Sequence, residues 1–217
     1  RPCRVRGDRA ACDRVRAGAP MRGVREMGTL KGRYGGMKLN IQKKLSEYFL
    51  YFMLYSIIGW IYEVFLEVVV YRWGFSNRGV LFGPYCIVYG VGAVVLILCL
   101  WKLKEKRICI GKIPVTPLLV FIGIVPITTA IELAASYIME STHGEWLWDY
   151  RRFAFNFEGR IALNPSIRFG IGGMVFLYVL QPLFKKLTAK MSDRTLYTVS
   201  LILFILLIAD VIFTFCL

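Results

Sequence analysis

The sequence lacks the residue spacings that are typical of metal sites and of disulfide frameworks. Its 217 residues contain one histidine, His143, and the six cysteines form no CxxC pair and have no zinc-like spacing. No GxxxxGK[ST] phosphate loop is present, so nucleotide hydrolysis would require another chain. We therefore expect no metal and no cofactor, and we predict no catalytic residue. The sequence favours a protein that is not an enzyme.

Acidic residues are also scarce. Lys and Arg number 28 against 14 Asp and Glu, which gives a formal net charge of +14, and such a charge by itself favours nucleic-acid binding. However, ten of the basic residues lie in the first 36 positions, where there is neither helical periodicity nor the apolar core of a signal peptide. We predict that residues 1–36 are a disordered or artefactual basic leader, with a nucleic-acid-binding arm as the alternative. We expect no nucleic-acid partner.

Long apolar runs dominate the rest of the chain. Hydrophobic residues make up 57% of the sequence and the mean hydropathy is +0.55, both above the values of soluble domains. Five runs approach or exceed the roughly 20 residues that a membrane-spanning helix needs. They cover residues 48–71, 80–101, 115–139, 167–184 and 196–217. We predict an all-α fold in which residues 37–217 form one bundle of five transmembrane helices.

Basic residues concentrate in alternate loops. They precede the first run, separate the second from the third, and separate the fourth from the fifth. By the positive-inside rule, the N-terminus is then cytoplasmic and the C-terminus lies outside. The stretch "WLWDYRRFAFNFEGRIALNPSIR", residues 146–168, becomes an outer loop. Its charges and aromatic rings are typical either of a belt at the membrane surface or of a lid over a cavity.

Four acidic residues interrupt the apolar runs, namely Glu63, Glu67, Glu132 and Asp210. With a rise of about 1.5 Å per residue, all four fall in the outer half of the membrane. A carboxylate facing lipid at mid-membrane costs roughly 2.5 to 3.5 kcal/mol, so we expect them to face the bundle interior. Arg78, Arg160 and Arg168 are their expected partners. Of the four, Glu67 is the one expected to reach the headgroups.

Glycine and proline positions add predictions about packing. Gly79 and Gly83 have GxxxG spacing and Gly90 follows seven residues later, a pattern that lets membrane helices approach closely. Pro126 cannot donate its backbone hydrogen bond, so we expect a bend in the third helix before Glu132.

Five ordered motifs carry a family resemblance. They are "GWIYE" at 59–63, "NRGVLFGPYCIVYG" at 77–90, "ELAASYIME" at 132–140, "WDY" at 148–150 and "NFEGRIAL" at 156–163. From about residue 59 to 182 the chain resembles the bacterial family of putative ABC-transporter type IV proteins. The resemblance implies a multi-pass transporter permease of the bacterial cytoplasmic membrane, with a separate ATPase chain as a partner. Arg168, in "SIRFG", stands where the family pattern has an apolar residue.

The inner loops bear on the ATPase partner. The two loops predicted to face the cytoplasm, at residues 102–114 and 185–195, are only about a dozen residues long. This argues against a docking surface for an ATPase and against coupling to ATP. The other partners that we expect are membrane lipids and a second copy of this chain, because five spans are few for a complete translocation path.

The ionisable residues of the outer half suggest a function. Such groups inside membranes commonly mark substrate or proton pathways, and mixed signs suit a zwitterionic or polar solute. We predict an outward-facing substrate-binding site formed by Glu63, Arg78, Glu132, Asp149, Asn156 and Arg160. One alternative is a membrane enzyme acting on an outer-leaflet lipid or polar substrate, with Glu63 or Glu132 as general base and Arg160 stabilising an anion. The other is an accessory protein whose charges only fix packing.

Overall fold

The computed structural model describes residues 22–72, 74–77, 79–144 and 148–216. The chain divides into two units, Arg1–Gln42 and Lys43–Leu217. Of the predicted leader, residues 1–21 lie outside the described residues. Residues 22–36 form the beginning of helix α1 (Arg22–Phe65), whose later part belongs to the second unit.

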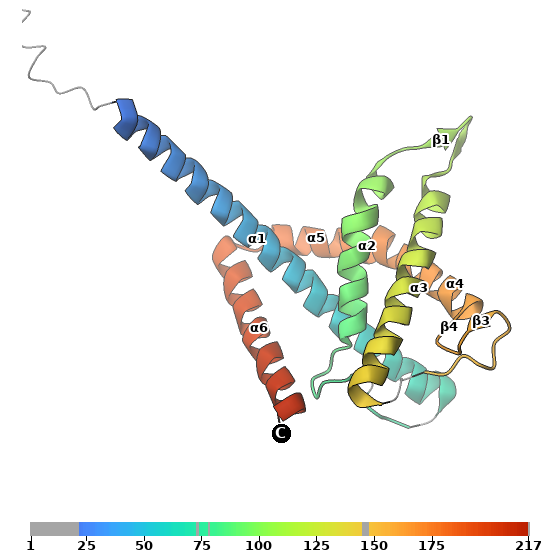
Figure 1. Ribbon diagram of the computed structural model, residues 1–217. Helices are drawn as coiled ribbons and strands as arrows, with labels where there is room; N and C mark the ends of the chain where they lie inside the picture. The colour runs from blue at the N-terminus through green and yellow to red at the C-terminus, as the bar shows by residue number, and fades with distance from the viewer. Residues whose placement is uncertain (1–21, 73, 78, 145–147, 217) are drawn as a thin grey trace, which may run out of the picture. The chain divides into compact units, whose positions relative to one another are not determined.

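Helices make up most of the described chain (Figure 1). Helix α1 continues into a π-helix, η1 (Leu66–Tyr71), and is followed by α2 (Ile87–Glu105) and α3 (Thr116–His143). Helix α4 (Leu163–Val175), π-helix η2 (Phe176–Leu180) and α5 (Gln181–Ala189) follow one another directly, and α6 (Asp193–Cys216) comes last. Two short antiparallel hairpins pair β1 (Cys109–Ile110) with β2 (Ile113–Pro114) and β3 (Asn156–Phe157) with β4 (Ile161–Ala162).

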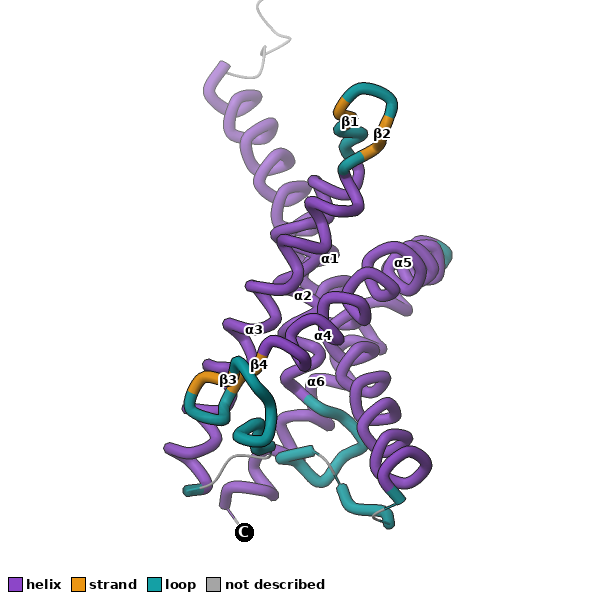
Figure 2. The backbone as a smooth tube through the Cα atoms, turned by 90° about the vertical axis from the view of Figure 1, so that its right-hand side faces the viewer, coloured by secondary structure: helices purple, strands orange, loops and turns teal. Residues whose placement is uncertain are grey.

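Five helical segments of the described chain are long and apolar enough to cross a membrane. They are Leu39–Val70, Ile87–Glu105, Thr116–Thr142, Leu163–Ala189 and Asp193–Thr214. This confirms the predicted all-α bundle of five spans. Within the second unit, Figures 1 and 2 place the β1–β2 hairpin at one end of α2 and α3. The β3–β4 hairpin and the loop between η1 and α2 lie at the other end.

The second span begins later than predicted. Helix α2 starts at Ile87 rather than near residue 80, and residues 79–86 form an irregular loop. Pro84 explains this local structure, because a proline disfavours helical geometry at the residue before it, here Gly83. The GxxxG pair Gly79 and Gly83, predicted to let helices approach closely, therefore lies in this loop and not on α2. By contrast, α3 continues as a helix through Pro126.

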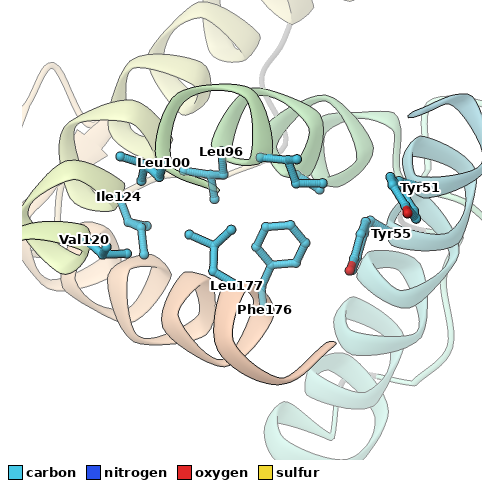
Figure 3. Close-up of a cluster of buried hydrophobic side chains, with 10 residues drawn as sticks. Tyr51, Tyr55, Leu96, Leu100, Val120, Ile124, Phe176 and Leu177 are labelled. Atoms are coloured by element: carbon cyan, nitrogen blue, oxygen red, sulfur yellow. The ribbon is translucent and has the colours of Figure 1, made fainter. Parts of the chain in front are cut away.

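The apolar core lies where α1, α2, α3 and η2 meet. Figure 3 shows Leu96 and Leu100 of α2 facing Val120 and Ile124 of α3, with Phe176 and Leu177 of η2 completing the cluster. Val120, Ile124 and Leu177 have no exposed surface. In lipid there is little gain from removing apolar surface, so van der Waals contacts in such clusters hold the helices together.

Small residues allow the helices to approach closely. A Cβ on Gly90 of α2 would lie 2.2 Å from Ser56 Oγ and 2.5 Å from the Phe52 carbonyl oxygen of α1. A Cβ on Gly59 of α1 would lie 2.3 Å from the Tyr89 ring of α2. These separations are shorter than van der Waals contact, so a larger residue at either position would push α1 and α2 apart. The packing role predicted for Gly90 is confirmed.

Candidate functional site

A row of polar residues runs along one face of α3. Thr129, Glu132, Ser136 and Glu140 follow one another at intervals of three or four residues, which places them on the same side of the helix. Glu132 stands ten residues before Thr142, where the span ends, and thus about 15 Å along the helix from that end. The row therefore leads from the end of the span to its middle.

A segment that we call the cap, residues 148–162, folds onto this polar face. The Tyr150 hydroxyl donates to Glu132 Oε1 at 2.8 Å, and Arg160 donates to Ser136 Oγ at 3.3 Å. Arg160 also forms an ion pair with Glu140, and the Trp148 indole donates to the Arg160 carbonyl oxygen at 2.8 Å. Within the described residues, these contacts hold the cap against α3.

The tight turn of the β3–β4 hairpin directs Arg160 toward α3. Its two central residues, Glu158 and Gly159, have φ of +52° and +73°, and Arg160 N–H donates to the Phe157 carbonyl at 2.9 Å. Positive φ at both central positions is typical of type I′ hairpin turns, where glycine is favoured. A Cβ on Gly159 would also lie 2.7 Å from Arg151 Cγ. The motif "NFEGR" therefore has a structural reason for its glycine.

Arg160 is buried and surrounded by partners. Its side chain is 8% exposed, and besides Glu140 it lies 3.5 Å from Glu158 Oε2. Its guanidinium carbon lies 4.2 Å from the centre of the Tyr137 ring, within cation–π range. Two carboxylates, a hydroxyl and an aromatic face thus hold this one cation. Such an arrangement anchors the cap to α3.

Glu132 has fewer partners than Arg160. Its residue is 7% exposed, and its Oε1 accepts the Tyr150 hydrogen bond. Its Oε2 is buried and has no hydrogen-bond partner among the described residues. An unsatisfied oxygen on a buried carboxylate is costly and calls for an explanation, such as a bound ion or ligand. Glu132 therefore has the capacity to accept one further positively charged or hydrogen-bond-donating group.

Asp149 and Asn156, both predicted as site residues, shape the cap. Asp149 Oδ1 accepts the Arg151 N–H at 2.9 Å and lies 3.8 Å from the Arg151 Nε. Asn156 donates to the Phe153 carbonyl at 2.8 Å, and its side-chain oxygen accepts the Gly159 N–H at 3.0 Å. Both side chains are exposed. They stabilise turns and face away from the buried core.

The remaining predicted acids lie in separate contacts. Glu63 of α1 accepts a hydrogen bond from the Tyr89 hydroxyl of α2. Glu67, expected at the headgroups, is instead 5% exposed and accepts from Ser76 Oγ at 2.7 Å and Ser76 N–H at 3.3 Å. The predicted site residue Arg78 lies outside the described residues. The structure therefore brings together Glu132 and Arg160 along α3 but describes Glu63 in a different contact.

Asp210 of α6 binds the loop that precedes α2. Its carboxylate accepts hydrogen bonds from Phe82 N–H at 3.2 Å, Gly83 N–H at 2.8 Å and the Tyr85 hydroxyl. It also accepts from Thr214 Oγ1 at 3.4 Å. Burial raises the pKa of the Tyr85 hydroxyl above its usual value, and its hydrogen bond to Asp210 raises it further, so this hydroxyl remains a proton donor. Both carboxylate oxygens of Asp210 are satisfied.

Tyrosine hydroxyls are the partners that the sequence analysis missed. For Glu63 and Glu132, the described partners are Tyr89 and Tyr150 rather than the expected arginines. The expected partner Arg168 is exposed. A neutral phenol can donate to a carboxylate without bringing a second charge into the membrane. The sequence held a signal, because Tyr150 stands within the "WDY" motif and Tyr89 within "YCIVYG".

Glu132 is 7% exposed, so little of the residue is open to solvent. A groove of about 350 Å³ lies beside the cap, and Glu132 is not among the residues lining it. The lining residues are Phe153, Ala154, Phe155, Leu163, Asn164 and Ile167. Within the described ranges, no three His, Cys, Asp or Glu side chains lie close enough together to hold a metal ion. Access to Glu132 thus requires the cap to move.

Comparison with known proteins identifies the family of this chain. The family model described as putative ABC-transporter type IV matches residues 50–215. No curated protein and no solved structure matches the chain. The matched range covers all five apolar segments in whole or in part, together with the cap and the four acids Glu63, Glu67, Glu132 and Asp210. The chain is therefore a multi-pass membrane protein that belongs to the putative ABC-transporter type IV family.

Proposed function

We propose that this protein is a transporter permease of the bacterial cytoplasmic membrane that binds a polar solute from the outside, between α3 and the cap. Its N-terminus is cytoplasmic and the cap faces outward, in accord with the basic residues of the alternate loops. The observation that carries the proposal is Glu132 Oε2, which has no hydrogen-bond partner among the described residues and belongs to a residue that is 7% exposed. Buried ionisable groups of this kind commonly line substrate pathways.

The contacts favour a solute that carries a positive charge, either alone or as part of a zwitterion. Glu132 Oε2 can accept a hydrogen bond from an ammonium group. Arg160 is already held by Glu140 and Glu158, so it serves this site as the anchor of the cap. Asp149 and Asn156 are exposed on the cap and would be the first polar groups that a solute meets. Glu63 and Arg78 are the remaining two residues that we propose for substrate binding.

Entry requires the cap to open. The Tyr150 hydroxyl covers Glu132 through one hydrogen bond of 2.8 Å, whereas the other end of the cap is fixed by Arg160. If the cap turned about a hinge near Arg160 and the Tyr150 hydrogen bond broke, Glu132 would become exposed. The β3–β4 hairpin would stay in contact with α3. The Tyr150 hydroxyl would then give way to the solute as the partner of the carboxylate.

A separate ATPase is the partner that the family's description implies, and the phosphate loop is absent from these 217 residues. The inner surface available to such a partner consists of the β1–β2 hairpin and the turn after α5. A second copy of the chain would supply the remaining helices of a translocation path. Membrane lipids would surround the exposed apolar faces.

Uptake into proteoliposomes tests the proposal. L-Lysine, L-alanine and tetramethylammonium serve as labelled probes with a positive group, and glucose serves as the neutral probe. We expect the wild-type protein to take up at least one charged probe, and Glu132→Gln to reduce that uptake about 10- to 100-fold. This range corresponds to the loss of a charged hydrogen bond of about 1.5 to 3 kcal/mol.

Glu47→Gln is the matched control. Glu47 also accepts a tyrosine hydrogen bond, from the Tyr51 hydroxyl at 2.7 Å, but it lies outside the cap and α3. This variant should keep wild-type uptake. If none of the charged probes enters above the level of protein-free liposomes, or if Glu132→Gln transports as well as the wild type, the proposed site is wrong.

The accessory alternative has one observation in its favour. Both oxygens of Asp210 accept hydrogen bonds from protein groups, and Arg160 pairs with two carboxylates, as charges that only fix packing would do. Under that alternative Glu132→Gln would lower the melting temperature and leave membrane transport unaffected. Measuring melting and uptake on the same variant therefore separates the two functions.

A further inference from the structure

A cluster of aromatic and basic residues lies at the end of the bundle away from the cap. Lys104 Nζ lies 4.1 Å from the centre of the Trp101 ring on α2, and Lys185 Nζ of α5 lies 4.8 Å from the same ring. Lys104 also approaches the Tyr178 ring of η2 at 5.3 Å. Two cations from separate helices thus share one indole. We call Trp101, Lys104, Tyr178 and Lys185 the tryptophan–lysine cluster.

The charge of this cluster is not balanced by the acid beside it. Glu105 Oε1 lies 4.0 Å from Lys185 Nζ, and both side chains are more than half exposed. One exposed carboxylate at this distance cannot neutralise two ammonium groups, and exposed pairs of this kind contribute little. Further basic residues flank the cluster in the sequence, namely Lys102, Lys106, Arg107 and Lys186. The cluster therefore attracts an anion.

The position of the cluster points to a lipid as the source of that anion. The span that contains Trp101 ends at Glu105, and the span that contains Lys185 ends at Ala189, so both lie near a membrane surface. Indole rings favour the headgroup level, and lysine stems extend along apolar surface toward it. Closer to mid-membrane, Leu98 and Val179 are 61% and 59% exposed and offer apolar contact for an acyl chain.

We infer that the tryptophan–lysine cluster binds the phosphate of an anionic phospholipid headgroup. Lys104 and Lys185 pair with the phosphate oxygens, and the Trp101 ring holds both ammonium groups at the depth of the headgroup. This inference does not rest on the proposed function, because the cluster shares no residue with α3 or the cap. It names a lipid class, whereas the sequence predicts only membrane lipids in general.

Native mass spectrometry of the full chain tests this inference. Purified protein in detergent is titrated with phosphatidylglycerol or phosphatidylcholine, and retained lipid is measured. We expect phosphatidylglycerol to bind more tightly than phosphatidylcholine. The Lys104→Gln/Lys185→Gln variant should lose about tenfold or more of this affinity, as two basic residues near an anionic surface imply. The preference should also weaken at high salt, since part of the attraction is screened.

Two further variants keep the test decisive. Lys104→Arg/Lys185→Arg retains both charges and should retain the preference, which separates loss of charge from misfolding. Lys112→Gln/Lys190→Gln removes two basic residues outside the cluster and should behave as the wild type. Equal binding of both lipids, an unchanged preference in the Lys104→Gln/Lys185→Gln variant, or equal loss in the Lys112→Gln/Lys190→Gln control would overturn the inference. So would displacement of the lipid by soluble glycerol phosphate at matched concentration, because that result indicates a free-phosphate site.

Discussion

Two carboxylates in the spans, Asp210 on α6 and Glu132 on α3, have opposite hydrogen-bond environments. Both oxygens of Asp210 accept hydrogen bonds, from two backbone N–H groups and two hydroxyls. Glu132 accepts one, from Tyr150, and its other oxygen has no partner among the described residues. Both acids interrupt apolar helices, and both are covered by a loop at the same end of the bundle.

The difference separates a structural acid from a candidate binding acid. Asp210 replaces the backbone partners that Phe82 and Gly83 lack in their irregular loop, so its charge is used within the fold. One oxygen of Glu132 can still accept a hydrogen bond, so fewer contacts within the fold depend on this residue. If this comparison is sound, substitutions of Asp210 should damage stability most and substitutions of Glu132 should damage it least.

The largest loss of stability is expected for Asp210→Ala. The substitution leaves two backbone N–H groups and the Tyr85 hydroxyl without their acceptor. We expect a destabilisation of about 2 to 3 kcal/mol, seen as a lower melting temperature in detergent. Asp210→Asn keeps one acceptor oxygen and should lose less. A melting temperature unchanged in both variants would mean that the loop before α2 is held by other contacts.

Arg160→Met should have an intermediate effect. Methionine keeps much of the packing against Tyr137 but loses the ion pairs with Glu140 and Glu158 and the bond to Ser136. Because both acids are about half exposed, water can replace the lost cation, and we expect about 1 to 2 kcal/mol. Limited proteolysis of the cap measures the loosening directly. Arg160→Lys retains the charge but not the forked geometry, so it should fall between wild type and Arg160→Met.

Glu132→Gln should have the smallest effect on stability, below about 0.5 kcal/mol, because it removes no satisfied hydrogen bond and takes a charge out of a buried position. The amide keeps the oxygen that accepts from Tyr150, and its nitrogen replaces the oxygen that has no described partner. The melting temperature should therefore stay near that of the wild type while uptake is lost. A fall in melting temperature as large as that of Asp210→Ala would reverse the comparison and favour a structural role for Glu132.

The sequence predicted the architecture well because apolar length and composition are local properties. The five predicted runs correspond to five helical spans, and the cap lies in the charged stretch between the third and the fourth of them. Boundaries were less accurate. Residues 80–86 are apolar enough to extend the second span, but Pro84 and the contacts with Asp210 keep them irregular. Hydropathy alone does not show where backbone N–H groups form hydrogen bonds outside a helix.

The candidate site was predicted only in part. Glu132 and Arg160 stood out as ionisable residues in or beside apolar segments, and they do lie along the same face of α3. Their partners Tyr150, Ser136 and Glu140 lie in the motifs "WDY" and "ELAASYIME", but a motif does not show which side chains meet once the chain folds. Arg160 was expected to meet the intramembrane acids and instead pairs with Glu140 and Glu158. The spacing of polar residues along α3 indicates which face of the helix they share, but not which loop residue covers that face.

The sequence by itself determined the class of the protein, the number of spans and which acids had to be shielded from lipid, because each follows from the transfer of local segments into a membrane. Only the tertiary structure decided which acid is saturated and which has an unused oxygen. Hydrogen bonds such as those of Asp210 with Gly83 and Tyr85 join residues more than 120 positions apart. Such contacts depend on how helices and loops pack, which no local pattern encodes.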